Sequence, residues 1–219
     1  MERKKIVGIF DFGNTGAGNN AGFESMLYLN GRMYQGVDAN HKEVFFDDIY
    51  CGTNMDVTFC LWSGLEGGGV PTPQEQRIAR ADLDWLDEEV DDFYYLASMV
   101  WETIKELDEF NPVQHDLRKA LDTACHCIDW AYPGSDTFYE SVHEADHLLN
   151  ESIDSMDKKS SVNIRCVGHT HIDVAWLWRL KHTREKCSRS FTTVLRLMEQ
   201  HPEYVFLQTQ PQLYEYMKE

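Results

Sequence analysis

The sequence predicts an α+β fold followed by the beginning of an α/β fold, and three changes of pattern predict it. Apolar and polar residues alternate over roughly the first seventy residues, as in half-buried strands. Apolar residues then recur every three or four positions up to about residue 155, as in amphipathic helices. Beyond residue 160 the pattern indicates a strand, a helix and a second strand. We therefore expect an N-terminal β region at 1–72, a helical domain at 73–157 and an α/β unit at 160–219.

Composition and charge exclude several classes of protein. The 219 residues carry 20 basic and 37 acidic side chains, and the formal charge of −17 repels nucleic acids and anionic membranes. No apolar run approaches the roughly 20 residues that a membrane-spanning helix needs. The 6 cysteines are dispersed, unlike those of small disulfide-rich secreted domains. We predict a cytoplasmic protein with reduced thiols and no nucleic-acid or membrane partner.

The first region is predicted to be an antiparallel sheet. The stretch "GFESMLYLNGRMYQGV" alternates on both sides of Asn30-Gly31, a dipeptide typical of type I′ hairpin turns because both residues tolerate positive φ. "KEVFF" and "MDVTFCLW" continue the alternation. The glycine-rich segment 13–22 lacks the spacing of a phosphate loop or a dinucleotide fingerprint, so we expect a loop there. The Gly- and Pro-rich segment 63–73 marks the end of the region.

Three helices are expected next, from Pro73 onward. Apolar stripes run along residues 86–107, 117–128 and 138–149. Asn111-Pro112 supplies a cap and a first helical residue for the second helix. Short connections between consecutive helices favour an antiparallel three-helix bundle.

The last region is predicted to be a βαβ unit. The polar segment 154–161 separates it from the helices. "VNIRCVG" is predicted to be a strand, the stretch from Ala175 to Gln200 a helix, and "YVFLQTQ" a second strand parallel to the first. The carboxyl end of the first strand is then where an α/β protein would place its active site.

Three residues that can bind a metal lie at that strand end. His169, His171 and Asp173 alternate with other residues, so an extended backbone would place all three side chains on one face. Imidazole nitrogen and carboxylate oxygen are good zinc ligands. The same residues could instead serve as hydrogen-bonding groups in a strand-to-helix turn, with Asp173 as a helix cap. The spacing leaves both interpretations open.

Two other patterns carry weaker metal signals. The segment His143–His147 matches His-Glu-x-x-His, in which two histidines bind zinc and the glutamate is the general base of a peptidase. Its longer form fails, because Asn150 and Ile153 stand where glycine and histidine are required. A zinc peptidase is therefore an alternative function. The other interpretation is that these residues form the solvent-exposed face of a helix. Cys125-His126-Cys127 cannot converge on one ion from three successive helical positions.

A family resemblance accounts for most of the chain. The segment beginning "GHTHIDVAWLWRL", with a Lys-Cys-x-Arg-x-Phe helix and a Phe-x-Gln-x-Gln strand after it, closely resembles the start of the catalytic domain of bacterial α-mannosidases of glycoside hydrolase family 38. "AGFESMLYLNGRMYQGVDANHKEVFF" and "LWSGLEGGGVP" resemble the N-terminal β region of the same proteins.

The resemblance implies a seven-stranded α/β barrel that performs zinc-dependent, retaining hydrolysis of terminal α-linked mannose from oligosaccharides. It assigns His171 and Asp173 as ligands of one zinc ion and leaves His169 as their neighbour. It places Trp176 against the sugar ring. The family is also compatible with a homo-oligomer in the full-length protein.

The family's remaining machinery has no counterpart in this sequence. The aspartate nucleophile, the general acid and the other zinc-binding histidine all fall beyond Glu219 in the family pattern. We therefore expect the chain to be an inactive fragment that holds the first βαβ unit of a truncated barrel. A stand-alone carbohydrate-binding or interaction module is the alternative from another class.

Overall fold

The structure is a computed structural model that describes residues 5–13, 23–46, 52–62, 77–157, 162–176 and 178–218. The glycine-rich segment 14–22, the segment 63–73 and residues 158–161 of the expected boundary lie outside the described residues. The chain divides into two compact units. The helical unit comprises Met1–Lys5 and Trp85–Asn163, and the β-rich unit comprises Ile6–Asp84 and Ile164–Glu219. The fold is α+β, with two antiparallel sheets and five α-helices among the described residues.

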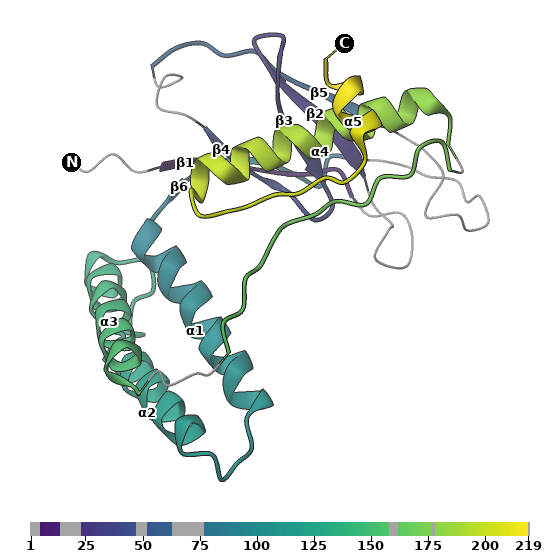
Figure 1. Ribbon diagram of the computed structural model, residues 1–219. Helices are drawn as coiled ribbons and strands as arrows, with labels where there is room; N and C mark the ends of the chain where they lie inside the picture. The colour runs from purple at the N-terminus through teal and green to yellow at the C-terminus, as the bar shows by residue number, and fades with distance from the viewer. Residues whose placement is uncertain are drawn as a thin grey trace. The chain divides into compact units, whose positions relative to one another are not determined.

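Six strands form the two sheets, in the orders β4-β1-β6 and β3-β2-β5 (Figure 1). The hairpin predicted at Asn30-Gly31 is confirmed: β2 and β3 pair antiparallel, and the two turn residues have φ values of 49° and 77°. The second sheet is completed by β5, which pairs antiparallel with β2. The strands are β1 (Lys5–Asp11), β2 (Glu24–Leu29), β3 (Arg32–Asp38), β4 (Glu43–Phe46), β5 (Val57–Trp62) and β6 (Arg80–Leu86).

The two sheets share one apolar core. Alternate residues of their strands point into it, because successive side chains of a strand face opposite sides. Phe12 packs edge-on against Phe23, and Phe10 packs against Phe59 of β5. The buried members of this core are Phe10, Phe12, Phe23, Leu27, Leu29, Tyr34, Val37, Val44 and Phe46.

Strand β6 corrects the expectation that the helical pattern begins at Pro73. Residues 80–86 pair with β1 as an edge strand. Their sequence "RADLDWL" alternates charged and apolar residues with a period of two, which is a strand signal. The alternation is short and adjoins the stripe of the next helix, and the two patterns merge when the sequence is read alone.

The helical unit contains α1 (Glu88–Glu106), α2 (Pro112–Cys127) and α3 (Asp136–Ser155), which lie side by side (Figure 1). Each N-cap side chain accepts a backbone N–H: Asp87, the predicted Asn111, and Ser135. The helices share cores to which each contributes, with Phe93 from α1, Ala124 from α2 and Leu149 from α3 among the buried residues. No helix among the described residues is long and apolar enough to cross a membrane.

The C-terminal part of the β-rich unit holds α4 (Leu180–Gln200) and α5 (Pro211–Tyr216). The strands expected before and after α4 are not formed. A single parallel bridge joins Gly168 to Phe206 in their place. The parallel direction agrees with the predicted unit, but a lone pair of segments gains little without flanking strands. Gly168 is required there, because a Cβ would overlap the Tyr204 hydroxyl.

Helix α4 begins at Leu180, five residues later than the sequence predicted. Ala175, where the helix was expected to start, has a φ of 61°, which is incompatible with a right-handed helix. Residues 173–176, 178 and 179 instead lie in no helix or strand and precede the helix.

Helix α4 packs closely on β3 through Gly36. A Cβ on Gly36 would lie 2.8 Å from both the Arg189 carbonyl oxygen and the Thr193 hydroxyl. We predict that Gly36→Ala lowers the free energy of unfolding by about 1–3 kcal/mol, because the helix must move off the sheet. Chemical denaturation measures the loss. Met33→Ala on the same strand is the control: its side chain is exposed, so a change below about 0.5 kcal/mol is expected. Equal effects of the two changes would contradict this packing.

Candidate functional site

The two predicted metal ligands are placed by the residue between them. Ile172 is 4% exposed and packs in a small core with Cys187 of α4 and Leu213 of α5. Residues 169–173 lie in neither a helix nor a strand, and the side chains on either side of the buried Ile172 are accessible to solvent. His171 and Asp173 therefore lie on the same, solvent-facing side.

The two side chains meet in a geometry that suits a shared ion. His171 Nε2 lies 3.1 Å from Asp173 Oδ1. Two donors of one tetrahedral zinc ion lie about 3.4 Å apart, given zinc–ligand distances near 2.1 Å. Their side chains are 75% and 41% exposed, so an ion can reach them. Among the described residues no group of three or more His, Cys, Asp or Glu side chains is arranged to hold a metal. The donors fit zinc as two members of a larger ligand set.

His169, the third residue of the motif, faces a different partner. Its Nδ1 lies 2.8 Å from the carbonyl oxygen of Leu207, in the segment after α4. This contact runs beside the parallel bridge, in which the Leu207 N–H donates to the Gly168 carbonyl and the Gly168 N–H donates to the Val205 carbonyl. His169 thus ties the motif to the neighbouring segment.

Two tryptophans lie after the donor pair. Trp176 is 52% exposed and meets Trp178 edge to face, with ring centroids 5.5 Å apart. The ammonium group of Lys186 lies 4.9 Å from the centroid of the Trp178 ring, a cation–π contact. Trp176 therefore presents an accessible aromatic face three residues after Asp173, and its ring packs on Trp178, which Lys186 of α4 contacts.

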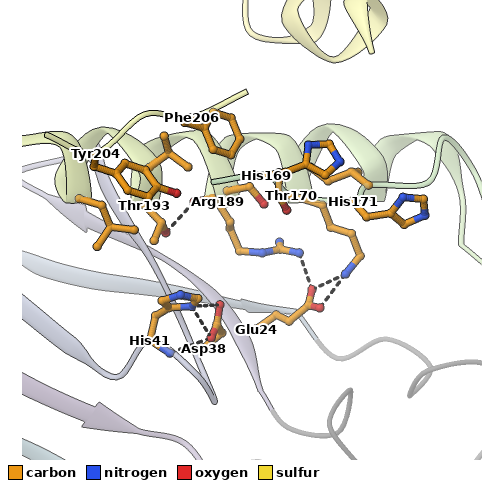
Figure 2. Close-up of a pocket in the computed structure, with 15 residues that line it drawn as sticks. Glu24, Asp38, His41, His169, Thr170, His171, Arg189, Thr193, Tyr204 and Phe206 are labelled. Atoms are coloured by element: carbon orange, nitrogen blue, oxygen red, sulfur yellow. Dashed lines mark hydrogen bonds and ion pairs between the residues drawn. The ribbon is translucent and has the colours of Figure 1, made fainter. Parts of the chain in front are cut away.

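A pocket of about 340 Å³ lies between the second sheet and α4, and residues 169–172 line its rim. At its centre, the Glu24 carboxylate of β2 accepts hydrogen bonds from Lys186 and Arg189 of α4, with N–O distances of 2.6 and 2.5 Å (Figure 2). The network is half-buried and charge-assisted, so it joins sheet and helix strongly.

Asp38 and His41 line the sheet side of the same pocket (Figure 2). Asp38 Oδ1 lies 3.0 Å from His41 Nδ1 and also accepts backbone N–H groups from Asn40 and His41. Burial opposes ionisation of Asp38, but these hydrogen bonds outweigh it and lower the pKa of the carboxyl. The hydrogen bond to Asp38 raises the pKa of His41, against a smaller effect of burial. The pair orders the turn between β3 and β4.

Comparison with known proteins supports the resemblance that the motif carries. Residues 161–219 match the profile of the glycosyl hydrolases family 38 N-terminal domain. Alpha-mannosidase G of Dictyostelium discoideum is 30% identical over 217 residues, which are 91% of this chain and 19% of that protein. Alpha-mannosidase 2C1 of Mus musculus is 35% identical over 208 residues, or 89% of this chain and 19% of that protein. The alpha-mannosidase of Saccharomyces cerevisiae is 28% identical over 166 residues, or 70% and 15%.

These findings support a glycoside hydrolase of family 38. The chain spans less than a fifth of the length of the relatives named above. The three relatives are eukaryotic proteins, so the bacterial origin implied by the resemblance stays a prediction. His171, Asp173 and Trp176 all lie inside the segment that matches the family 38 profile.

The two histidines of the alternative His-Glu-x-x-His motif contact carboxylate groups of this chain. His143 lies on α3, and its two ring nitrogens each lie 3.1 Å from a carboxylate oxygen, one of Asp87 and one of Glu89. His147 Nε2 lies 3.7 Å from Glu151. His143 thus joins α3 to the start of α1, which accounts for it without a metal. The comparisons favour a glycosidase over the peptidase alternative.

Sequence reasoning missed the charged network that lies beside the family 38 motif. Glu24 and Lys186 are 162 positions apart, and nothing in either local pattern pairs them. One signal was available in the sequence. In a strand Glu24 and Met26 point to the same face, and Met26 contacts Thr192 of α4, so the charged Glu24 side chain also faces the helix.

Glu24→Gln tests whether this network holds the sheet on α4. We predict a loss of about 1–3 kcal/mol in the free energy of unfolding, because two half-buried cations lose their shared negative partner. Urea denaturation at neutral pH measures it. Glu215→Gln is a matched control, since the Glu215–Lys218 pair is mostly exposed and its loss should cost less than about 0.5 kcal/mol. An equally small effect at Glu24 would show that the network contributes no more than a surface pair.

Proposed function

We propose that this chain supplies the first part of the active site of an α-mannosidase, which removes terminal α-linked mannose from oligosaccharides. The observation that supports it most directly is the donor pair His171 and Asp173 beside an exposed tryptophan, inside the segment that matches the family 38 profile. The relatives that bear the name alpha-mannosidase support the substrate class. Oligosaccharide breakdown is the corresponding biological role.

In this proposal His171 and Asp173 are two of the ligands of one zinc ion. Bound zinc would supply positive charge that orients the mannose hydroxyls and stabilises the distorted sugar. The two donors stand on either side of the buried Ile172, and their 3.1 Å separation fits that role. The resemblance makes His169 a supporting neighbour rather than a ligand, and its Nδ1 lies 2.8 Å from the Leu207 carbonyl oxygen.

Trp176 is proposed as the platform for the sugar. The face of a pyranose ring is apolar and packs well on indole, and Trp176 is half exposed beside the donor pair. Retaining hydrolysis further needs two carboxyl groups about 5 Å apart, one as nucleophile and one as acid and base. The resemblance assigns neither to a residue of this sequence, so the chain holds substrate and metal contacts without the groups that break the bond.

The wider architecture belongs to the same proposal. Residues 160–219 would form the first strand, helix and strand of a seven-stranded barrel, after the N-terminal β region, which β6 extends to Leu86, and the helices α1, α2 and α3. A cytoplasmic compartment is supported by the free thiols of all five cysteines among the described residues. Homo-oligomerisation of the full-length protein remains part of the proposal.

The 219-residue chain is expected to bind zinc weakly and to be inactive on an aryl α-mannoside. Isothermal titration with zinc chloride measures binding, and release of the chromogenic alcohol measures hydrolysis. His171→Ala and Asp173→Asn should each weaken binding about tenfold or more, since each removes one of two donors. His143→Ala is the control and should leave the zinc affinity unchanged. Loss of zinc binding in His143→Ala alone would favour the peptidase site, and chelator-sensitive turnover would refute the inactivity.

A chimaera tests the proposed activity itself. Residues 161–219 would replace the matching segment of the Saccharomyces cerevisiae alpha-mannosidase, which supplies the remaining groups. We expect the chimaera to hydrolyse an aryl α-mannoside, and Asp173→Asn within it to lower kcat/KM by about 100-fold or more, the scale of losing a group that stabilises transition-state charge. Arg165→Lys, at an exposed position, is the control. A folded chimaera whose activity is unaffected by Asp173→Asn would overturn the proposed role of the site.

A further inference from the structure

We propose that Thr183 is the positioning residue of this site: its hydroxyl fixes Asp173, Ala175 and Trp178 in the conformation that presents the donor pair and the aromatic platform. Thr183 lies in the first turn and a half of α4 and is fully buried. It touches neither proposed ligand group directly. Its role would be to hold the backbone and the ring that carry them.

The Thr183 hydroxyl uses all of its hydrogen-bonding capacity on this loop. It donates to the backbone carbonyl of Asp173 at 3.2 Å. It accepts the backbone N–H of Ala175 at 3.1 Å and the indole N–H of Trp178 at 3.0 Å. A hydroxyl has one donor and two acceptor positions, so the group is satisfied by three partners of the same short segment.

The contact to Ala175 stabilises an unfavourable backbone conformation. The φ of 61° at Ala175 is in the left-handed region, which is unfavourable for a residue with a Cβ. Ala175 lies between the Asp173 donor and Trp176, so its conformation affects how the chain passes from one to the other. A buried hydrogen bond to the Ala175 N–H offsets the cost and makes this the preferred conformation.

The contact to Trp178 reaches the sugar platform. Thr183 fixes the indole nitrogen, and Lys186 one turn further along α4 lies over the same ring. Held from two sides, Trp178 meets Trp176 edge to face and restricts its orientation. A single hydroxyl thus controls both the backbone of the Asp173 donor and the support of Trp176.

Thr183→Val tests the role, because valine has the same shape and lacks the hydroxyl. We expect the indole N–H and the Ala175 amide to lose their acceptor, and the hydrogen exchange of both to accelerate at least about tenfold, as followed by ¹H–¹⁵N NMR on the 219-residue chain. Thr183→Ser keeps the hydroxyl and should restore exchange to within about threefold of the original chain. Trp178→Phe assigns the indole signal.

Thr192→Val is the matched control on the same helix. The Thr192 hydroxyl donates to the Ser188 and Arg189 carbonyls of its own helix, so the change removes a hydroxyl without touching the loop. It should leave the exchange of the Trp178 indole and the Ala175 amide unchanged. Equal acceleration in Thr192→Val and Thr183→Val would mean general loosening of α4 and would overturn the proposal.

The consequence for the metal site rests on the proposed function and has its own measurement. Zinc titration should show a Kd raised about tenfold in Thr183→Val and restored in Thr183→Ser, the scale of losing a group that orients a ligand. Faster exchange with an unchanged Kd would refute the positioning of Asp173. If the unmodified chain binds no zinc, the proposed metal site fails. The hydrogen-exchange rates then decide alone whether Thr183 positions these residues. Unchanged exchange in Thr183→Val overturns the proposed role of Thr183.

Discussion

The burial of Ile172 against α4 and α5 is the contact on which the site depends. Its side chain packs with Cys187 and Leu213 in an apolar core, and burial raises the pKa of the Cys187 thiol, which keeps it neutral and unreactive. Anchoring this one residue constrains the backbone on either side of it, where the His171 and Asp173 side chains are accessible. Two polar side chains that would otherwise be mobile are thereby held on one side of the core, 3.1 Å apart.

Helix α4 connects this anchor to the rest of the β-rich unit. Its first turns hold the motif through Thr183, and Lys186 contacts both Trp178 and the Glu24 carboxylate of β2. The same ammonium group therefore supports the aromatic pair and joins the helix to the sheet. The close approach at Gly36 keeps α4 against β3 further along. The N-terminal sheet is thus part of the structure that positions the site, although it supplies no proposed ligand.

Features of the fold that depend on local chemistry were predictable. Asn30-Gly31 determines its hairpin because few other dipeptides adopt positive φ twice, and Asn111 determines the start of α2 through its capping side chain. The start of α4 was not predictable, since "AWLW" has good helix formers and the left-handed Ala175 depends on a hydrogen bond from eight residues away. Strand β6 was missed because its short alternation ran into the stripe of α1. In each failure a tertiary contact or a neighbouring pattern overrode the local preference.

The proposed site likewise contains two kinds of residue: those that would contact the metal or the sugar, and those that hold them in position. His171, Asp173 and Trp176 were predicted from the sequence through the family resemblance, and alternate spacing of His169, His171 and Asp173 by itself left metal binding open. Thr183 is chemically ordinary, and its role exists only because the loop returns to α4 and places three partners around one hydroxyl. Groups that orient the ligands of a metal site strongly affect its affinity for the metal, so substituting such a group should weaken metal binding. The sequence motif therefore describes the proposed site incompletely, because hydrogen bonds from α4 hold the residues that follow Asp173.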